Sequence, residues 1–443
     1  MIEIAGFPYL GVEFTKDGTV HKEREVEELL DGLGEATDLI VLAHGWNNDM
    51  QQARRLYENL LGTMRKRIDA GGIAGLENRS FAVLGILWPS KKFADEDFIA
   101  GGAASLDVSA AEEDLQRQLE DLKGVFDDPE ADAHLESAKA LVGQLESSEQ
   151  ARDDFAALIK SSLSPDKADD EDASDTFFEL PGRELMARLA TPTVPADETP
   201  APGGGGAATM GGVAAGGAAG GAAGIGDFFA DMKAAARSLL NFATYYQMKA
   251  RAGEVGSKGV NDVLRRVKAA RPEMRLHLAG HSFGGRLVAA AVLGPEDKPA
   301  VLPNSLTLLQ AAFSHFGFAD DYQGEKDGFF RPIFVKKMIS GPLVVTHTDN
   351  DKAVGIAYPM ASRIARQVAS GLGDKNDLYG GIGRNGAQKT PEATAGELLA
   401  AGQGYDFKSG KVYNLKADKF ISDHSDVTGS EVAHALLSAI GST

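Results

Sequence analysis

The sequence feature that most limits the fold is a serine between two glycines, at a point where an apolar strand passes directly into an apolar helix. The stretch reads LAGHSFGGR, with Gly280 and Gly284 on either side of Ser282. The run Met274–Ala279 before it has the pattern of a strand, and Arg286–Leu293 after it has the pattern of a helix. Such a turn holds the serine in a strained backbone conformation, and only small neighbours leave room for it. The motif therefore predicts a nucleophile elbow with Ser282 as the nucleophile.

Short apolar runs rich in β-branched residues recur along the chain and alternate with helical patterns. The further runs are Asp38–Ala43, Phe81–Trp88, Ser305–Ala311, Pro342–Thr346 and Lys411–Leu415. Helical periodicity occurs over Lys22–Leu30, Asn48–Gly71 and Gly259–Ala270, the last with Ser257 as its expected cap. Strands that alternate with helices favour a mostly parallel sheet covered on both faces, so the predicted fold class is α/β.

The middle of the chain differs from the rest in charge. Residues 91–200 hold 28 of the 64 acidic residues but only 10 of the 45 basic ones. Amphipathic helices are predicted near 109–125, 129–145 and 148–163, and a Gly/Ala-rich stretch at 196–226 is predicted to be a flexible tether. A long helix with many apolar side chains, Asp227–Ala252, follows the tether and is expected to end at Gly253.

These patterns divide the chain into two predicted parts. Residues 1–92 and 253–443 are expected to form one catalytic domain, interrupted by an acidic helical insertion at 93–252. An insertion before the nucleophile strand falls above the carboxyl edge of the sheet, where it can form a cap or lid over the site.

Composition excludes several classes of function. The net charge of −19 argues against non-specific nucleic-acid binding, which needs a basic surface. The absence of cysteine excludes disulfides and thiolate metal sites, and neither a zinc-protease motif nor a Walker motif occurs. A GxGxxG run at Gly381–Gly386 follows no convincing strand, so no dinucleotide site is expected there. We expect neither a metal nor a cofactor.

The sequence gives little indication of a membrane segment. Its start, MIEIAGFPYL, has neither a basic region nor a long apolar segment, so no cleaved signal peptide is expected. The longest uncharged run, Thr199–Gly226, is too weakly apolar for a stable transmembrane insertion. A cytoplasmic location is the resulting expectation, with export by another route left open. The oligomeric state also stays open.

A second motif, His44-Gly45-Trp46, directly follows the predicted strand Asp38–Ala43. An oxyanion hole needs two backbone amides directed at one point, one after the nucleophile and one from an early strand–helix loop. Phe283 and Trp46 are expected to supply these two amides. Because Gly45 permits close approach of the backbone, His44 and Gly45 are expected to line the substrate site.

Together, His44-Gly45-Trp46 and the later motif GHSFGG at 280–285 resemble the α/β-hydrolase superfamily, in particular its bacterial lipase- and esterase-like members. The resemblance covers the predicted catalytic domain and does not extend to the insertion. It implies an α/β-hydrolase fold with a large helical cap or lid before the nucleophile strand. It also implies the chain order nucleophile, acid, histidine, with the acid after a late strand and the histidine after the last strand.

Asp351 and His424 are the residues that meet this order. Asp351 follows a late predicted strand and opens an apolar helix, as the family's acid commonly does, while Asp349 in the same loop remains an alternative. His424 lies in a polar loop after the last predicted strand, where a general base can reach the serine. The other late histidine, His434, falls inside the predicted C-terminal helix, where a packed histidine is expected.

The expected activity is that of a serine hydrolase that cleaves carboxylic esters through Ser282, His424 and Asp351 and an acyl-enzyme. The expected partner is a small-molecule or lipid ester. Phe228 and Phe229 are expected to contact that ester if the long helix covers the site, and a core helix is the alternative. An acyltransferase or amidase with the same triad is a second possible function. A non-catalytic scaffold that binds through its acidic insertion is a third.

Overall fold

The computed structural model describes most of the chain. The described residues are 2–46, 50–90, 108–165, 168, 170–190, 223–324, 326–351, 361, 364–365, 375 and 377–443, without the side chains of 108–110, 170 and 223–231. The flexible tether predicted at 196–226 lies outside these residues up to position 222.

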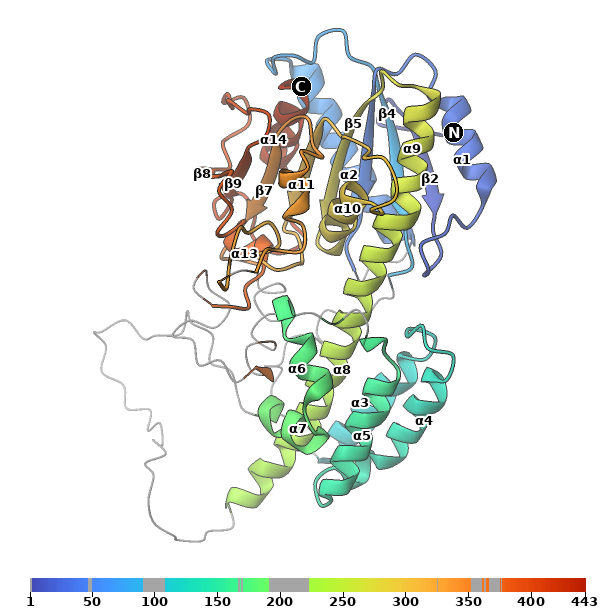
Figure 1. Cartoon of the computed structure of the whole chain (residues 1–443), viewed down its shortest axis with the longest axis vertical. Helices are drawn as coiled ribbons and strands as arrows, with labels where there is room; N and C mark the ends of the chain where they lie inside the picture. Colours follow the sequence, from blue (N-terminus) through green and yellow to red (C-terminus); the bar gives the residue numbers. More distant parts are fainter. Residues whose placement is uncertain are drawn as a thin grey trace, which may run out of the picture.

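The described residues form a nine-stranded sheet (Figure 1). In spatial order its strands are β1 (Ile2–Ile4), β2 (Phe7–Glu13), β4 (Phe81–Leu87), β3 (Asp38–Ala43), β5 (Arg275–His281), β6 (Ser305–Leu309), β7 (Leu343–His347), β9 (Val412–Lys416) and β8 (Ala393–Glu397). β1 is antiparallel to β2, and every other neighbouring pair is parallel. The predicted α/β class with a mostly parallel sheet is confirmed.

Helices cover both faces of the sheet, because side chains alternate between the faces along each strand. On β3, Leu39, Val41 and Ala43 pack into one core, whereas Ile40 and Leu42 pack into another. The first face is covered by α1 (Glu23–Gly32), α9 (Asn261–Ala270) and α10 (Phe283–Leu293), and the second by α2 (Met50–Ala70) and α14 (Ser430–Gly441). Because parallel strands end at the same edge, the loops that follow β3, β5, β7 and β9 meet at one edge of the sheet.

The helical insertion forms a separate layer beside the sheet domain (Figure 1). Its helices are α3 (Val108–Asp121), α4 (Ala131–Leu141), α5 (Glu149–Ser161), α6 (Ser174–Glu179) and α7 (Gly182–Ala190), which pack against one another and against the long helix α8 (Ala223–Glu254). The start of α5 is capped by Ser148, whose Oγ accepts a hydrogen bond from the Ala151 amide at 3.1 Å. A helical insertion between β4 and β5 is therefore confirmed.

Three buried cations on α8 join the insertion together. Lys249 Nζ lies 2.7 Å from a carboxylate oxygen of Asp172, and both side chains are buried. Lys233 and Arg251 are buried too, and they pair with Glu112 and Glu146, and with Asp127, respectively. Because a buried charge is stable only when it is paired, part of the acidic excess of the insertion is turned inward.

Among the described helices, none combines the length and the apolar character that a bilayer span needs.

The prediction that the long helix ends at Gly253 is wrong. The helix passes through Gly253 into a π-helical segment, Val255–Val260, and then into α9. Ser257 is not a cap either, because its Oγ donates to the Gly253 carbonyl at 2.8 Å within this segment. The glycines here serve close packing: a Cβ on Gly256 would lie 2.1 Å from the Leu287 carbonyl oxygen, and one on Gly259 would lie 2.1 Å from that of Gly18.

Three strands, β1, β2 and β8, are not predicted by the sequence pattern. All three lie toward the ends of the sheet, and the residues of β1 and β8 are mostly exposed. An edge strand with few buried side chains carries little apolar periodicity, so its pattern resembles that of a loop.

Two glycines of the same helix give a matched stability test. Gly256→Ala is expected to lower the free energy of unfolding by about 1–3 kcal/mol, because its Cβ meets a backbone carbonyl that cannot move aside. Gly253→Ala has open space and is expected to raise it by up to about 1 kcal/mol through helix propensity. Urea unfolding of both variants checks this. Equal effects would show that Gly256 is not a packing site.

Candidate active site

Ser282 lies at the turn from β5 into α10, in a backbone conformation that side chains rarely adopt. Its φ is +56° and its ψ is −126°. The turn is fixed from both sides, since the Ser282 amide donates to the Leu309 carbonyl at 3.1 Å and its own carbonyl accepts from Ala312 at 3.0 Å. Only 5% of Ser282 is exposed. The strained turn that the motif predicts is thus present. It places the serine directly after β5 and against the end of β6.

Three glycines make this turn possible. A Cβ on Gly280 would lie 2.1 Å from the Gly284 carbonyl oxygen, and a Cβ on Gly284 would lie 2.2 Å from that of Ala43. A Cβ on Gly45 would lie 2.6 Å from the Cβ of Ser282. The loop after β3 and the turn after β5 are therefore in direct backbone contact, at a distance that no larger residue permits.

The loop after β3 is held from behind by buried side chains. The His44 amide donates to Tyr57 Oη at 2.9 Å, and Trp88 Nε1 donates to the His44 carbonyl at 2.9 Å. The ring of His44 is fully buried, donates from Nδ1 to the Gly45 carbonyl and accepts the Trp88 amide at Nε2. One donor and one acceptor suit the neutral ring, and burial lowers the pKa of His44 to about 4. His44 thus has no exposed surface for a substrate and acts on the loop instead.

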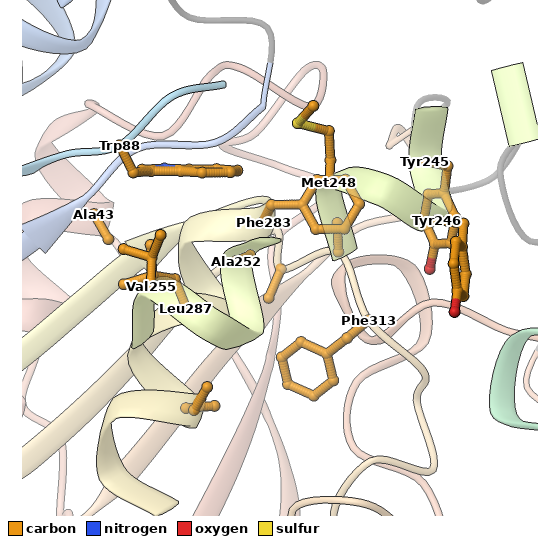
Figure 2. Packing of buried hydrophobic residues seen from close by; sticks show 14 of the residues in the cluster. Ala43, Trp88, Tyr245, Tyr246, Met248, Ala252, Val255, Phe283, Leu287 and Phe313 are labelled. Carbon is orange, nitrogen blue, oxygen red and sulfur yellow. The ribbon is translucent and has the colours of Figure 1, made fainter. Parts of the chain in front are cut away.

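Trp46 and Phe283, the residues expected to supply the oxyanion-hole amides, lie side by side. Their ring centroids are 5.9 Å apart in an edge-to-face arrangement. As the first residue of α10, Phe283 has an amide that finds no acceptor within the helix. Figure 2 shows Phe283 with Trp88 on one side and Tyr245 of α8 on the other, and the Tyr245 ring centroid lies 5.3 Å away.

His424 and Asp351 come together although 73 residues separate them in the chain. His424 lies in the loop after β9, and Asp351 lies in the loop after β7, where it is fully buried. His424 Nδ1 lies 2.8 Å from Asp351 Oδ2. Because a carboxylate only accepts, Nδ1 is the donor and Nε2 is left as the basic nitrogen.

The alternative residues are directed elsewhere. The carboxylate of Asp349 lies 3.0 Å from Lys416 Nζ, and 59% of its side chain is exposed. His434 is buried in α14, where Nε2 donates to the Gln403 carbonyl at 2.6 Å. Neither contacts His424 or Ser282 by a hydrogen bond in the described part of the chain.

Ser282 and His424 lie at the same edge without a direct hydrogen bond between them in the described residues. Such a bond is often long in a site without substrate and tightens when substrate binds. The ring of His281, next to Ser282, has its centroid 4.8 Å from that of His424.

The outer end of α8 is not described in side-chain detail. Phe228 and Phe229 belong to this helix, but their side chains lie outside the described residues. From Met232 to Lys249 nearly every side chain is buried, including Tyr245 against Phe283. This stretch therefore packs as a core helix between the insertion and the site.

Residues that the motifs do not reveal also hold the site. Asn350 Nδ2 donates to the carbonyls of Ile421 at 2.8 Å and Asp418 at 3.1 Å, which ties the loop after β7 to the loop that carries His424. Such bonds to backbone carbonyls leave no recognisable spacing in a sequence.

The described residues show neither a metal site nor a dinucleotide-binding turn at the GxGxxG run. In the part of the chain that the structure describes, no three His, Asp or Glu side chains gather as metal ligands would. The GxGxxG run contains the short helix α13 (Ile382–Asn385), and a Cβ on Gly383 would lie 2.6 Å from the backbone of Gln310. This glycine serves packing.

Comparison of the chain with protein-family models, with curated proteins and with solved structures gave no match in any of the three. The chemistry of the site is therefore argued from its own residues.

Two neighbouring tyrosines test the support of the loop after β3. Tyr57→Phe removes the acceptor of the buried His44 amide and is expected to lower the free energy of unfolding by about 1–3 kcal/mol. Tyr9→Phe is expected to be neutral or stabilising, because burial raises the pKa of Tyr9 to about 12 and its hydroxyl has no partner among the described residues. Denaturant unfolding measures both. A Tyr9→Phe loss as large as that of Tyr57→Phe would contradict this account.

Proposed function

We propose that this protein is a serine hydrolase that cleaves carboxylic esters through an acyl-enzyme, with Ser282 as nucleophile, His424 as base and Asp351 as the acid that orients it. The observation that carries the proposal is the 2.8 Å pair of His424 Nδ1 and Asp351 at the sheet edge where Ser282 holds its strained turn. A strained serine beside a carboxylate-oriented imidazole is the arrangement that activates a hydroxyl for attack.

We also propose that the sheet domain is an α/β-hydrolase fold. Three features support this assignment. The nucleophile turn follows β5, the acid follows β7 and the histidine follows β9, which is the chain order that the resemblance implies. The intervening helical insertion enters before β5. The loop after β3 lies against the nucleophile turn, where an oxyanion hole needs it.

The reaction would proceed in two halves. His424 Nε2 accepts the hydroxyl proton as Ser282 Oγ attacks the ester carbonyl carbon. The amides of Trp46 and Phe283 then bind the oxyanion, at about 3 kcal/mol per donor. The leaving alcohol takes the proton back from His424 as the carbon–oxygen bond breaks. Water then attacks the acyl-enzyme with His424 again as base, and the acid and free Ser282 are released.

The surroundings of the site favour an uncharged acyl group. Trp46, Phe283 and Tyr245 form an aromatic cluster that includes the residue directly after the serine, and aromatic side chains suit contact with apolar acyl chains. The substrate is therefore proposed to be a small-molecule or lipid ester, with Gly45 leaving room for its carbonyl. Phe228 and Phe229 remain proposed contacts at the outer end of α8.

A covalent probe tests the nucleophile. A fluorophosphonate is expected to label Ser282, and Ser282→Ala is expected to abolish both labelling and hydrolysis of a p-nitrophenyl ester. The matched control is Ser305, whose Oγ lies 2.9 Å from His277 Nδ1, while His277 Nε2 lies 2.8 Å from Asp38. That second Ser–His–Asp chain is fully buried, so Ser305→Ala is expected to keep full labelling. Labelling at any other serine would refute the assignment.

The two aspartates give a separate test. Asp351→Asn is expected to lower kcat by about 10⁴-fold, because the amide favours the wrong tautomer of His424. Asp349→Asn breaks only an exposed pair with Lys416 and is expected to change kcat less than about threefold. Steady-state kinetics with the same ester measure both. A reversed order would make Asp349 the acid, and cleavage of amides but not esters would favour the amidase alternative.

A further inference from the structure

We propose that His281 is a positioning residue that fixes the loop of His424 against the nucleophile turn by donating a hydrogen bond from its side chain to the His424 carbonyl. His281 Nε2 lies 2.8 Å from that carbonyl oxygen. This inference rests on the proposed hydrolase function, because His281 acts only through His424 and touches no substrate.

The position of His281 gives it this reach. It is the last residue of β5 and is bonded directly to Ser282. His281 is 7% exposed, and its ring centroid lies 4.8 Å from that of His424. On its other side, Nδ1 would lie 3.2 Å from a Cβ at Gly45. The His281 side chain thus contacts the loop that carries His424 and lies between that loop and the loop after β3.

The protonation state of His281 suits a permanent donor. A backbone carbonyl only accepts, so Nε2 carries the hydrogen. Nδ1 is buried and has no hydrogen-bond partner among the described residues, so it needs no proton. Burial, followed by the neighbouring His424, lowers the pKa of His281 to about 3. The neutral ring therefore keeps the same donor throughout the pH range in which a histidine base works.

Other hydrogen bonds of the loop that carries His424 go to the loop after β7. Asp351 holds the ring of His424, and Asn350 holds the backbone at Ile421 and Asp418. These contacts fix His424 relative to the loop after β7, whereas the bond from His281 fixes it relative to Ser282. Without that bond His424 would remain paired with Asp351 but would lose its alignment with the serine. Misplacement of a catalytic group by about 1 Å can cost about 100-fold in rate.

The test compares variants that keep or lose the donor. His281→Phe keeps a ring without a donor, and we expect kcat on a p-nitrophenyl ester to fall about 10- to 100-fold with KM nearly unchanged. His281→Gln places an amide N–H the same number of bonds from Cβ and is expected to recover most of kcat. His281→Asn is too short to reach the carbonyl and provides a second donor-less variant if His281→Phe does not fold.

His434 is the matched control. It is also buried and donates from Nε2 to a loop carbonyl, that of Gln403, away from the site. His434→Phe is expected to lower stability while leaving kcat unchanged. Wild-type kcat in both donor-less variants, or equal losses in His281→Phe and His281→Gln, would overturn the proposal.

Hydrogen–deuterium exchange of peptides from 417–429 separates this inference from the proposed function. Faster exchange is expected in His281→Phe and His281→Asn but not in His281→Gln or His434→Phe, whether or not the protein has esterase activity. If the wild type neither hydrolyses esters nor reacts with a fluorophosphonate, the proposed function fails and exchange alone decides whether His281 holds the loop. Unchanged exchange in the donor-less variants would overturn the role of His281.

Discussion

The contact of backbone on backbone at the turn after β5 is the constraint on which the rest of the site depends. Gly280 lies against Gly284, Gly284 lies against Ala43, and Gly45 lies against Ser282, all at distances that exclude a Cβ. These contacts pack the backbones of β3, β5 and the start of α10 directly against one another and place the loop after β3 against the serine. The strained conformation of Ser282 is maintained by this crowding and by hydrogen bonds to Leu309 and Ala312.

Much of this arrangement follows from local sequence signals. Buried parallel strands consist of apolar side chains, so β3 is predicted residue for residue and β5, β6, β7 and β9 to within two residues at either end. The edge strands β1 and β8 have mostly exposed side chains and escape prediction. The predicted helix end at Gly253 is wrong, because a glycine inside a helix has the same sequence signature as a glycine that ends one. Tyr57, Asn350 and His281 act through hydrogen bonds to backbone groups that are distant in the sequence, and such bonds carry no sequence period.

The acidic excess of the insertion is larger in the sequence than on the surface of the folded protein, because part of it is paired with buried cations. Lys233, Lys249 and Arg251 are buried along α8, and each pairs with at least one carboxylate from the rest of the insertion. Removing one member of such a pair would leave a buried charge uncompensated, which is costly in a low-dielectric interior. The acidic helices are therefore fixed to α8 by charge as well as by apolar packing, and the formal charge of residues 91–200 overstates what they present to solvent.

The continuity of α8, the π-helical segment and α9 makes one rod that begins in the insertion and ends beside the sheet (Figure 1). Its outer part, α8, has 32 residues, which at 1.5 Å per residue is about 48 Å. A rotation of about 5° at the π-helical segment would therefore move the outer end by about 4 Å, while Tyr245 and Arg251, nearer the pivot, would move much less. Small changes in the packing of the π-helical segment against Leu287 would therefore produce much larger displacements at the far end of the insertion.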